Sequence, residues 1–171
     1  ADVNKSIYVY IEELGLYKKV DSQVVGNQIT FNAEENSVYL VGGGNTVGTK
    51  VAKDGWNNIN GSWYVINSDG SLKTGWYNEK GTWYNLATNG KMNTGWFKDT
   101  DGKYYLFAED GSMQIGWHNV NGEWYFMNSK GEMATGWIKG SDDKWYYLKE
   151  NGSMAHDEYI NGYYVSSNGE W

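Results

Sequence analysis

Tryptophan is the residue whose type and spacing in this sequence could support a binding chemistry. The chain of 171 residues contains 10 Trp and 15 Tyr but no Cys and no Pro. Gly-Trp dipeptides recur at steps of 20, 20, 21 and 20 residues, with their Trp at Trp56, Trp76, Trp96, Trp117 and Trp137. Aromatic rings repeated at a fixed interval can stack on a sugar ring or surround a cation, because their faces carry partial negative charge.

Two further elements follow each Gly-Trp dipeptide at nearly constant spacing. The first is an aromatic pair, found at Trp63-Tyr64, Trp83-Tyr84, Tyr104-Tyr105, Trp124-Tyr125 and Trp145-Tyr146. The second is a Gly-x-Leu or Gly-x-Met segment, which ends at Leu72, Met92, Met113, Met133 and Met154. Five copies in register predict an array of repeats, numbered here from the first to the fifth.

Each repeat is predicted to be a β-hairpin. In the fourth repeat, Asn121-Gly122 separates two strand-like runs, and both residues tolerate the positive φ of a two-residue turn. Such a turn pairs Asn119 with Trp124 and Trp117 with Phe126. Because side chains alternate along a strand, Trp117 and Trp124 then share one face, and Tyr125 points to the other.

A lone hairpin is only marginally stable, so the repeats are expected to stack on one another. The predicted fold class is therefore all-β, a solenoid of stacked β-hairpins, with a small N-terminal segment of uncertain structure. In such a stack the Tyr of each repeat faces the aromatic pair of the repeat before it. Three aromatic walls would meet at each junction and remain open to water on one side.

Three interpretations of these junctions stay open at this point. The rings could simply hold the hairpins together. They could bind a quaternary ammonium group, which cannot donate hydrogen bonds and is attracted to ring faces. They could instead stack on a glycan. A Met beside the rings would add a soft, polarizable wall.

The pattern Gly-Trp-x4–6-Gly-x-Trp-Tyr-x5-Gly-x-Met-x-Thr-Gly-Trp closely resembles the choline-binding repeats of cell-wall-binding modules in autolysins, phage endolysins and surface proteins of streptococci and clostridia. The resemblance covers about residues 55–171 and implies a left-handed β-solenoid that recognises choline on teichoic acids. It implies sites made of two Trp of one repeat and a Tyr of the next, often with a Met nearby. Glucan-binding and toxin repeats are relatives that usually lack the paired Trp, so a glucan or other polysaccharide-binding module is the alternative.

Carried over to this sequence, the resemblance implies three well-matched choline sites: Trp56, Trp63 and Tyr84; Trp76, Trp83 and Tyr105; and Trp117, Trp124 and Tyr146. The junction of the third and fourth repeats has Trp96 and Tyr125 but Tyr104 in place of the second Trp, so a weaker site or none is expected there. The last junction offers Trp137 and Trp145 with either Tyr163 or Tyr164. Met92, Met113 and Met133 are the candidate Met walls.

The ends of the chain depart from the repeat. The last segment has His156-Asp157-Glu158 where Thr-Gly-Trp would stand, which is typical of a degenerate capping repeat. Residues 1–54 are predicted to form an N-terminal capping or linker segment, and residues 55–171 the array of five repeats with its cap. Ile7, Tyr10, Ile11 and Leu14 have helical spacing, whereas Ile7, Val9 and Ile11 alternate as in a strand. Short strands are expected at 17–25, 28–32 and 37–41, the last imitating the second strand of a repeat.

Charge and composition exclude several classes of function. A net charge of −7 disfavours nucleic acids and anionic membranes, and no apolar run approaches the roughly 20 residues of a membrane span. The two His lie outside metal-ligand spacing and the carboxylates are scattered in turns, so we expect no catalytic residue, metal or cofactor. The chain begins at Ala1, which suggests a fragment or processed form. The resemblance implies an extracellular, wall-associated or phage-encoded module that follows a catalytic domain such as an amidase or lysozyme; a homodimer stays open.

Overall fold

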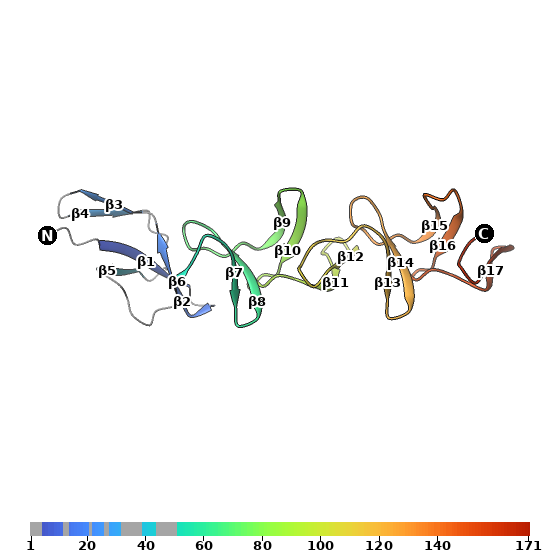
Figure 1. The fold of residues 1–171 in the computed structure, drawn as a ribbon, viewed down its shortest axis with the longest axis horizontal. Helices are drawn as coiled ribbons and strands as arrows, with labels where there is room; N and C mark the ends of the chain where they lie inside the picture. The colour runs from blue at the N-terminus through green and yellow to red at the C-terminus, as the bar shows by residue number, and fades with distance from the viewer. Residues whose placement is uncertain (1–4, 12–13, 21, 26–27, 32–38, 44–50) are drawn as a thin grey trace. The chain divides into compact units, whose positions relative to one another are not determined.

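The structure is a computed structural model that describes residues 5–11, 14–20, 22–25, 28–31, 39–43 and 51–171 (Figure 1). The chain divides into two compact units. Unit 1 contains Ala1–Glu79 and Asn85–Met92, and unit 2 contains Lys80–Tyr84 and Asn93–Trp171. The named elements of the described residues are all β-strands, so the all-β class is confirmed. None of these residues belongs to a helix long and apolar enough to span a membrane.

Unit 1 begins with a four-stranded sheet in the order β5-β1-β2-β6 and a separate hairpin β3-β4. The strands are β1 (Lys5–Ile11), β2 (Leu16–Val20), β3 (Ser22–Val25), β4 (Gln28–Phe31), β5 (Tyr39–Gly43) and β6 (Val51–Ala52). Ile7, Val9 and Ile11 are all buried, because alternation along β1 turns them toward one side. The helical interpretation of this segment is therefore wrong. The expected imitation of a repeat strand at 37–41 is also wrong in its described part, since β5 pairs with β1.

A buried lysine joins this sheet to the first repeat within unit 1. The Lys18 side chain is almost fully buried, and its Nζ forms an ion pair with Asp54 and donates to the carbonyl oxygen of Ser68 at 3.0 Å. Ile11, Leu16, Ala52 and Ile66 form the adjoining hydrophobic cluster. The sheet is thus anchored on the first repeat by both apolar packing and a satisfied buried charge.

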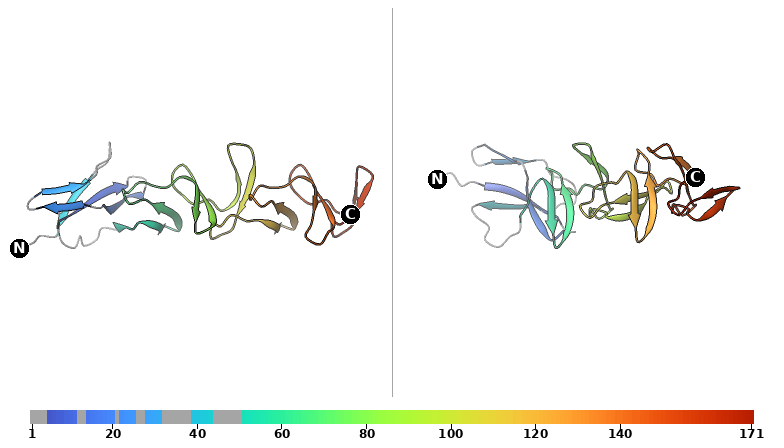
Figure 2. Two further views of the ribbon diagram at one scale, coloured as in Figure 1. Left: turned by 90° about the horizontal axis from the view of Figure 1, so that it is seen from above. Right: turned by 45° about the vertical axis from the view of Figure 1, so that its right-hand side comes forward.

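Six two-stranded hairpins follow. They are β7 (Gly55–Ile59) with β8 (Ser62–Ile66), β9 (Gly75–Glu79) with β10 (Thr82–Leu86), β11 (Gly95–Lys98) with β12 (Tyr104–Phe107), β13 (Gly116–Val120) with β14 (Glu123–Met127), β15 (Gly136–Lys139) with β16 (Trp145–Leu148), and β17 (Glu158–Ile160) with β18 (Tyr163–Val165). In the fourth, φ is 54° at Asn121 and 92° at Gly122, and Asn119 pairs with Trp124. The predicted turn and register are confirmed. The hairpins of unit 2 project in different directions about the path of the chain (Figure 2).

The Gly-x-Met segments connect successive repeats of unit 2. Met133 bridges to Met127 of its own hairpin, and its backbone N–H donates to the carbonyl oxygen of Tyr104 in the preceding repeat at 2.8 Å. The same bond joins Met154 to Trp124 at 2.7 Å. A Cβ at Gly152 would collide with the Met133 side chain, and φ there is +84°, so glycine suits this close approach of the repeats. A ladder of backbone bonds and buried side chains therefore replaces a central core.

Candidate aromatic pockets

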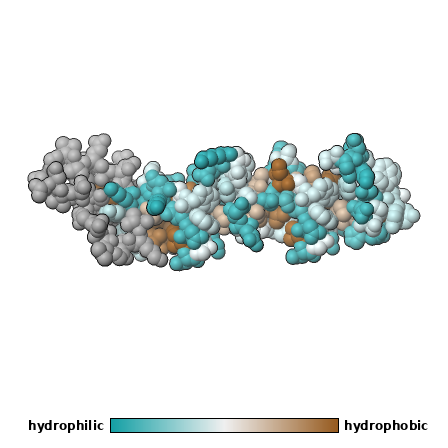
Figure 3. Space-filling view, viewed as in Figure 1, coloured by the Kyte–Doolittle hydropathy of each residue, from teal (hydrophilic) through white to brown (hydrophobic). Residues whose placement is uncertain are grey.

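Three pockets in unit 2 lie where the sequence predicts meeting points of aromatic side chains. Each is lined by two aromatic residues of one hairpin and a Tyr of the next. The register of each hairpin explains the first two walls, because residues paired or diagonal across the strands project from the same face. On the face shown in Figure 3 the surface is mostly hydrophilic to neutral with small hydrophobic patches. The large exposed side chains that line the pockets are aromatic: Trp96, Tyr104, Trp124, Trp145, Tyr163 and Trp171.

The widest of the three, called here the Trp117 pocket, measures about 560 Å³. Trp117, Trp124 and Tyr146 line it as predicted, and the ring centroids of Trp117 and Tyr146 lie 5.1 Å apart at 69°. Trp124 is 44% exposed. The other lining residues are Gly122, Met154, His156, Ser167 and Asn168. The last four bring a thioether and polar groups that the sequence analysis did not assign to a site.

Tyr146 is held in place from outside the Trp117 pocket. Its hydroxyl donates to Oδ2 of Asp142 at 2.7 Å. Burial, followed by this hydrogen bond, raises the pKa of Tyr146 to about 12, and the same bond lowers the pKa of Asp142. A Cβ at Gly140 would lie 2.9 Å from Cε2 of Tyr146, so a side chain there would displace the ring. Tyr146 therefore presents a neutral ring, polarised by a carboxylate at its far end.

The Trp96 pocket measures about 320 Å³ and is lined by Trp96, Tyr104, Tyr125, Met133, Glu150 and Asn151. Trp96 and Tyr125 are 4.9 Å apart, and Tyr104 occupies the position of the second Trp. Nζ of Lys98 lies 5.1 Å from the centroid of the Tyr104 ring. The chain's own cation thus lies against one of the walls. A pocket forms despite the substitution, and its lower affinity remains a prediction.

The Trp137 pocket measures about 300 Å³ and is lined by Trp137, Trp145, Tyr163 and Trp171. Of the two candidate Tyr residues, Tyr163 lies 6.0 Å from Trp137, whereas Tyr164 contacts Tyr159 at 5.1 Å. Sequence reasoning missed Trp171. Its signal was the spacing of Gly169-Glu-Trp171, which repeats the Gly-x-Met segment with Trp in the last position.

The two remaining predicted sites each draw residues from both units, so their assembly stays a prediction. Trp56 and Trp63 lie in unit 1 with ring centroids 6.3 Å apart, while Tyr84 belongs to unit 2. Trp76 belongs to unit 1, and Trp83 and Tyr105 to unit 2. Within unit 1, Trp56 also contacts Tyr77 at 5.9 Å, and its Nε1–H donates to Oε2 of Glu79 at 2.9 Å. The sequence analysis assigned neither Tyr77 nor Glu79 to a site.

The methionines pack between repeats. Met92 is 7% exposed, and a Cβ at Gly131 or Gly152 would collide with Met113 or Met133 respectively. Met133 and the unpredicted Met154 also line pockets. Met133 and Met154 therefore combine repeat stacking with a place in a pocket wall, while a binding role for Met92 and Met113 stays a prediction.

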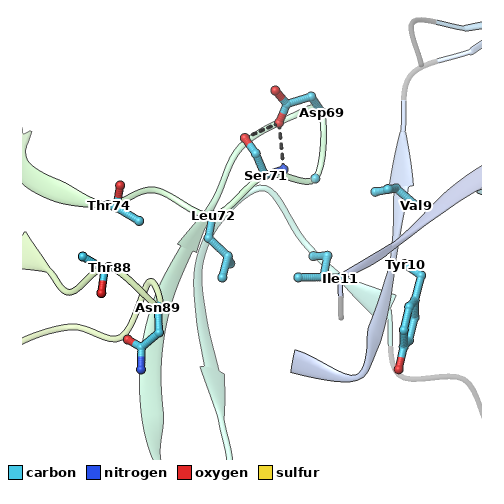
Figure 4. A pocket seen from close by; sticks show the side chains of 10 residues that line it. Val9, Tyr10, Ile11, Asp69, Ser71, Leu72, Thr74, Thr88 and Asn89 are labelled. Atoms are coloured by element: carbon cyan, nitrogen blue, oxygen red, sulfur yellow. Dashed lines mark hydrogen bonds between the residues drawn. The ribbon is translucent and has the colours of Figure 1, made fainter. Parts of the chain in front are cut away.

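A different cavity, of about 300 Å³, lies in unit 1 beside β1 (Figure 4). Val9, Ile11 and Leu72 give it an apolar side, and Thr74, Thr88 and Asn89 a polar one. The Asp69 carboxylate beside it accepts hydrogen bonds from the backbone N–H and the hydroxyl of Ser71, at 2.8 and 2.7 Å. That carboxylate organises a turn, and the lining contains no Trp, so this cavity differs in kind from the three aromatic pockets.

The described residues contain no cluster of three or more His, Cys, Asp or Glu that could hold a metal ion. His118 lies 3.0 Å from the Ile115 carbonyl oxygen through Nε2, and His156 is 3.2 Å from Oδ2 of Asp157. The three aromatic pockets present ring faces, and two of them also have polar groups at their edges.

Comparison with known families agrees with this geometry. Residues 114–159 match the choline-binding repeat, and residues 54–72, 74–92 and 94–113 match the cell wall binding repeat. Together these segments cover more than half of the chain. The chain belongs to the choline-binding repeat family. No curated protein matches it.

Solved structures of the family are similar to this chain. Choline binding protein F from Streptococcus pneumoniae, solved in the presence of a peptidoglycan analogue, is 40% identical over 70% of this chain and 40% of its own, with a TM-score of 0.64. The choline-binding domain of CbpL from the same organism is 32% identical over 70% of this chain and 64% of its own, with a TM-score of 0.58. The modular autolysin LytC of that organism is 26% identical over 70% of this chain and 28% of its own, also at 0.58. The chain thus spans about 40% of the length of choline binding protein F.

Proposed function

We propose that this chain is a non-catalytic cell-wall-binding module that recognises the choline of teichoic acids in aromatic pockets between successive repeats. The observation that carries the proposal is the Trp117 pocket, where Trp117, Trp124 and Tyr146 surround an open space of about 560 Å³. The other two pockets of unit 2 repeat this arrangement around Trp96 and Trp137. The predicted sites around Trp56 and Trp76 would extend it to the remaining repeats.

A trimethylammonium group is the ligand that these walls suit best. It is weakly hydrated and donates no hydrogen bonds, so losing water costs it little. Each ring face attracts it by about 0.5–1 kcal/mol when exposed and by about 2 kcal/mol when desolvated. The Asp142 carboxylate on the Tyr146 hydroxyl and a net charge of −7 on the chain both favour a cation over an anion.

Several weak sites on one chain would act together on a wall polymer that carries many choline groups. Once one site is occupied, the others meet their ligand at a high effective concentration, so avidity exceeds the affinity of any one site. The module would thereby hold an attached lytic enzyme or surface protein at the outside of the cell wall. The similarity to the modular autolysin LytC supports this targeting role.

The proposal is tested by isothermal titration of the purified chain with choline, with ethanolamine and glucose oligomers as controls. We expect saturable binding of choline at millimolar or lower concentration and at several sites, competition by tetramethylammonium, and little heat from ethanolamine. Trp124→Ala should reduce the number of sites. Tyr159→Ala is the matched control, because Tyr159 is 72% exposed and lines none of the three pockets.

Two results would count against choline. If neither heat nor Trp fluorescence changes up to about a hundred millimolar choline, the pockets bind no quaternary ammonium of this kind. If glucose oligomers bind instead and choline does not compete, the polysaccharide-binding alternative replaces the proposal.

A further inference from the structure

The Trp137 pocket is built differently from its neighbours at one position. In the fourth and fifth repeats the residue that follows Gly-x and lines the preceding repeat's pocket is a Met (Met133 and Met154), whereas here it is Trp171. The equivalence is structural as well as sequential. The backbone N–H of Trp171 donates to the carbonyl oxygen of Trp145 at 2.9 Å, as that of Met154 does to Trp124.

The side chain nevertheless behaves differently from the Met it replaces. Met154 is 8% exposed and packs against Gly169, with its Cε 2.5 Å from where a Cβ would stand. Trp171 is 54% exposed, and its ring lies 6.0 Å from that of Trp137 and 4.9 Å from that of Tyr163. A residue that stacks repeats elsewhere has here become a fourth wall of the pocket.

Several interactions fix this wall before any ligand arrives. The backbone carbonyl of Glu170 accepts a hydrogen bond from Ser166 at 2.9 Å, and its carboxylate pairs with Lys144 at 2.6 Å. The Trp171 ring is further held at its edge by Trp137 and Tyr163. Because these contacts restrict the ring before binding, part of its ordering cost is already met, and more of its attraction for a ligand appears as affinity.

We propose that Trp171 is a specificity-determining residue that makes the Trp137 pocket a four-ring cage selective for fully alkylated ammonium groups. This inference rests on the proposed function and extends it. The pocket is lined by aromatic side chains alone, and no carboxylate, amide or lysine lies in its wall. A protonated tertiary amine has one N–H group that hydrogen-bonds to water. Inside this cage the aromatic walls offer no acceptor to replace that bond. A quaternary ammonium has no such bond to lose and meets four ring faces.

The test resolves individual pockets by the indole N–H signals of ¹⁵N-labelled protein, assigned through single Trp→Phe variants. The probes are choline and N,N-dimethylethanolamine. We expect the Trp137 and Trp145 signals to respond at choline concentrations roughly threefold to tenfold lower than those of Trp117 and Trp124. The ratio of the two probes' midpoints should also be larger at the Trp137 pocket.

Trp171→Met supplies the matched variant, because it restores the residue of the other repeats and keeps the backbone bonds. It should raise the choline midpoint of the Trp137 and Trp145 signals roughly threefold to tenfold and reduce the probe ratio, while Trp117 and Trp124 respond as before. Trp171→Phe should give a choline midpoint and a probe ratio between those of the unaltered chain and those of Trp171→Met. Unchanged Trp117 and Trp124 signals also report that the variant is folded.

The outcomes separate this inference from the proposed function. If choline moves the signals of the Trp117 pocket, but Trp171→Met leaves the midpoint and probe ratio of the Trp137 pocket unchanged, Trp171 has no such role and the proposed function stands. If no indole signal of the unaltered chain responds to choline, both fail together.

Discussion

The Trp117 and Trp137 pockets lie at consecutive junctions of the repeat array, yet they differ in volume and in the chemistry of their walls. The first measures about 560 Å³ and has polar edges, and the second measures about 300 Å³ and is wholly aromatic. Lys144 pairs with Glu170 across the narrow junction at 2.6 Å, which raises the pKa of Lys144. The equivalent positions of the wide junction hold Glu123 and Ser153.

The Trp96 pocket shows the same association between a small volume and an ion pair across the junction. It measures about 320 Å³, and there Lys103 pairs with Glu132 at the equivalent positions. Their mutual hydrogen bond raises the pKa of Lys103 and lowers that of Glu132. Two narrow pockets thus carry an inter-repeat ion pair, and the wide pocket lacks it at those positions. A repeat scaffold can therefore tune each site by residues outside the aromatic walls.

The largest effect is expected from the hairpin that the two pockets share. Leu148 is fully buried in β16, which bears Tyr146 for the wide pocket and Trp145 for the narrow one. Leu148→Ala should lower the free energy of unfolding by about 2–4 kcal/mol, through lost burial and an unfilled cavity. Urea denaturation followed by circular dichroism measures this change. Choline binding should weaken at both pockets.

Val165→Ala is the contrasting variant, because β18 supplies an aromatic wall only to the narrow pocket, through Tyr163, while Ser167 and Asn168 after it lie at the edge of the wide one. It should weaken the Trp137 pocket more than the Trp117 pocket. Equal losses at both pockets would mean that the two junctions do not behave as separate sites, contrary to the nearest-neighbour character of solenoids.

Next in size are the effects of single walls. Trp117→Ala and Trp137→Ala each remove a ring that meets a Tyr of the next repeat edge-on. Each should weaken choline binding about tenfold at its own pocket and little at the other, since a ring face is worth about 0.5–1 kcal/mol when exposed and about 2 kcal/mol when desolvated. Pocket-resolved titration of the two variants and of the double variant measures this. A strongly non-additive double variant would show that the pockets are coupled.

Local signals in the sequence explain how much of this could be predicted. Asn121-Gly122 fixes a two-residue turn, the turn fixes the register, and the register places Trp117 and Trp124 on one face. Those steps involve neighbours in the chain only. The pairing of β5 with β1 and the burial of Lys18 depend on segments far apart in sequence, for which no turn gives a signal. Trp171 escaped prediction because the last hairpin is shorter and its Met position holds a residue of another kind.

A smaller effect is expected from the ion pair that distinguishes the narrow junction. Glu170→Ser copies the Ser153 of the wide junction and removes the partner of Lys144. An exposed pair of this kind contributes little, so the choline affinity of the Trp137 pocket should fall by only about twofold. The difference should shrink at high salt, because screening already weakens the pair in the unaltered chain. Glu109→Ser, at an exposed residue outside the pockets, should change nothing; equal effects from both variants would indicate a general charge effect.

The smallest expected effect is a pH dependence of the unfolding free energy that arises from Tyr146 in the wide pocket. The pKa of this residue is raised from 10.0 to about 12, so between these values the unfolded chain has lost a proton that the folded chain keeps. The unfolding free energy should therefore fall as pH rises through this window, and less so in Tyr146→Phe. Below pH 10 the ring stays neutral, so neither choline affinity nor stability should change with pH on its account. Denaturation at pH 9 and pH 11 in both proteins measures the difference; an equal fall would show that other groups carry the alkaline loss and that burial and the bond to Asp142 do not hold the proton.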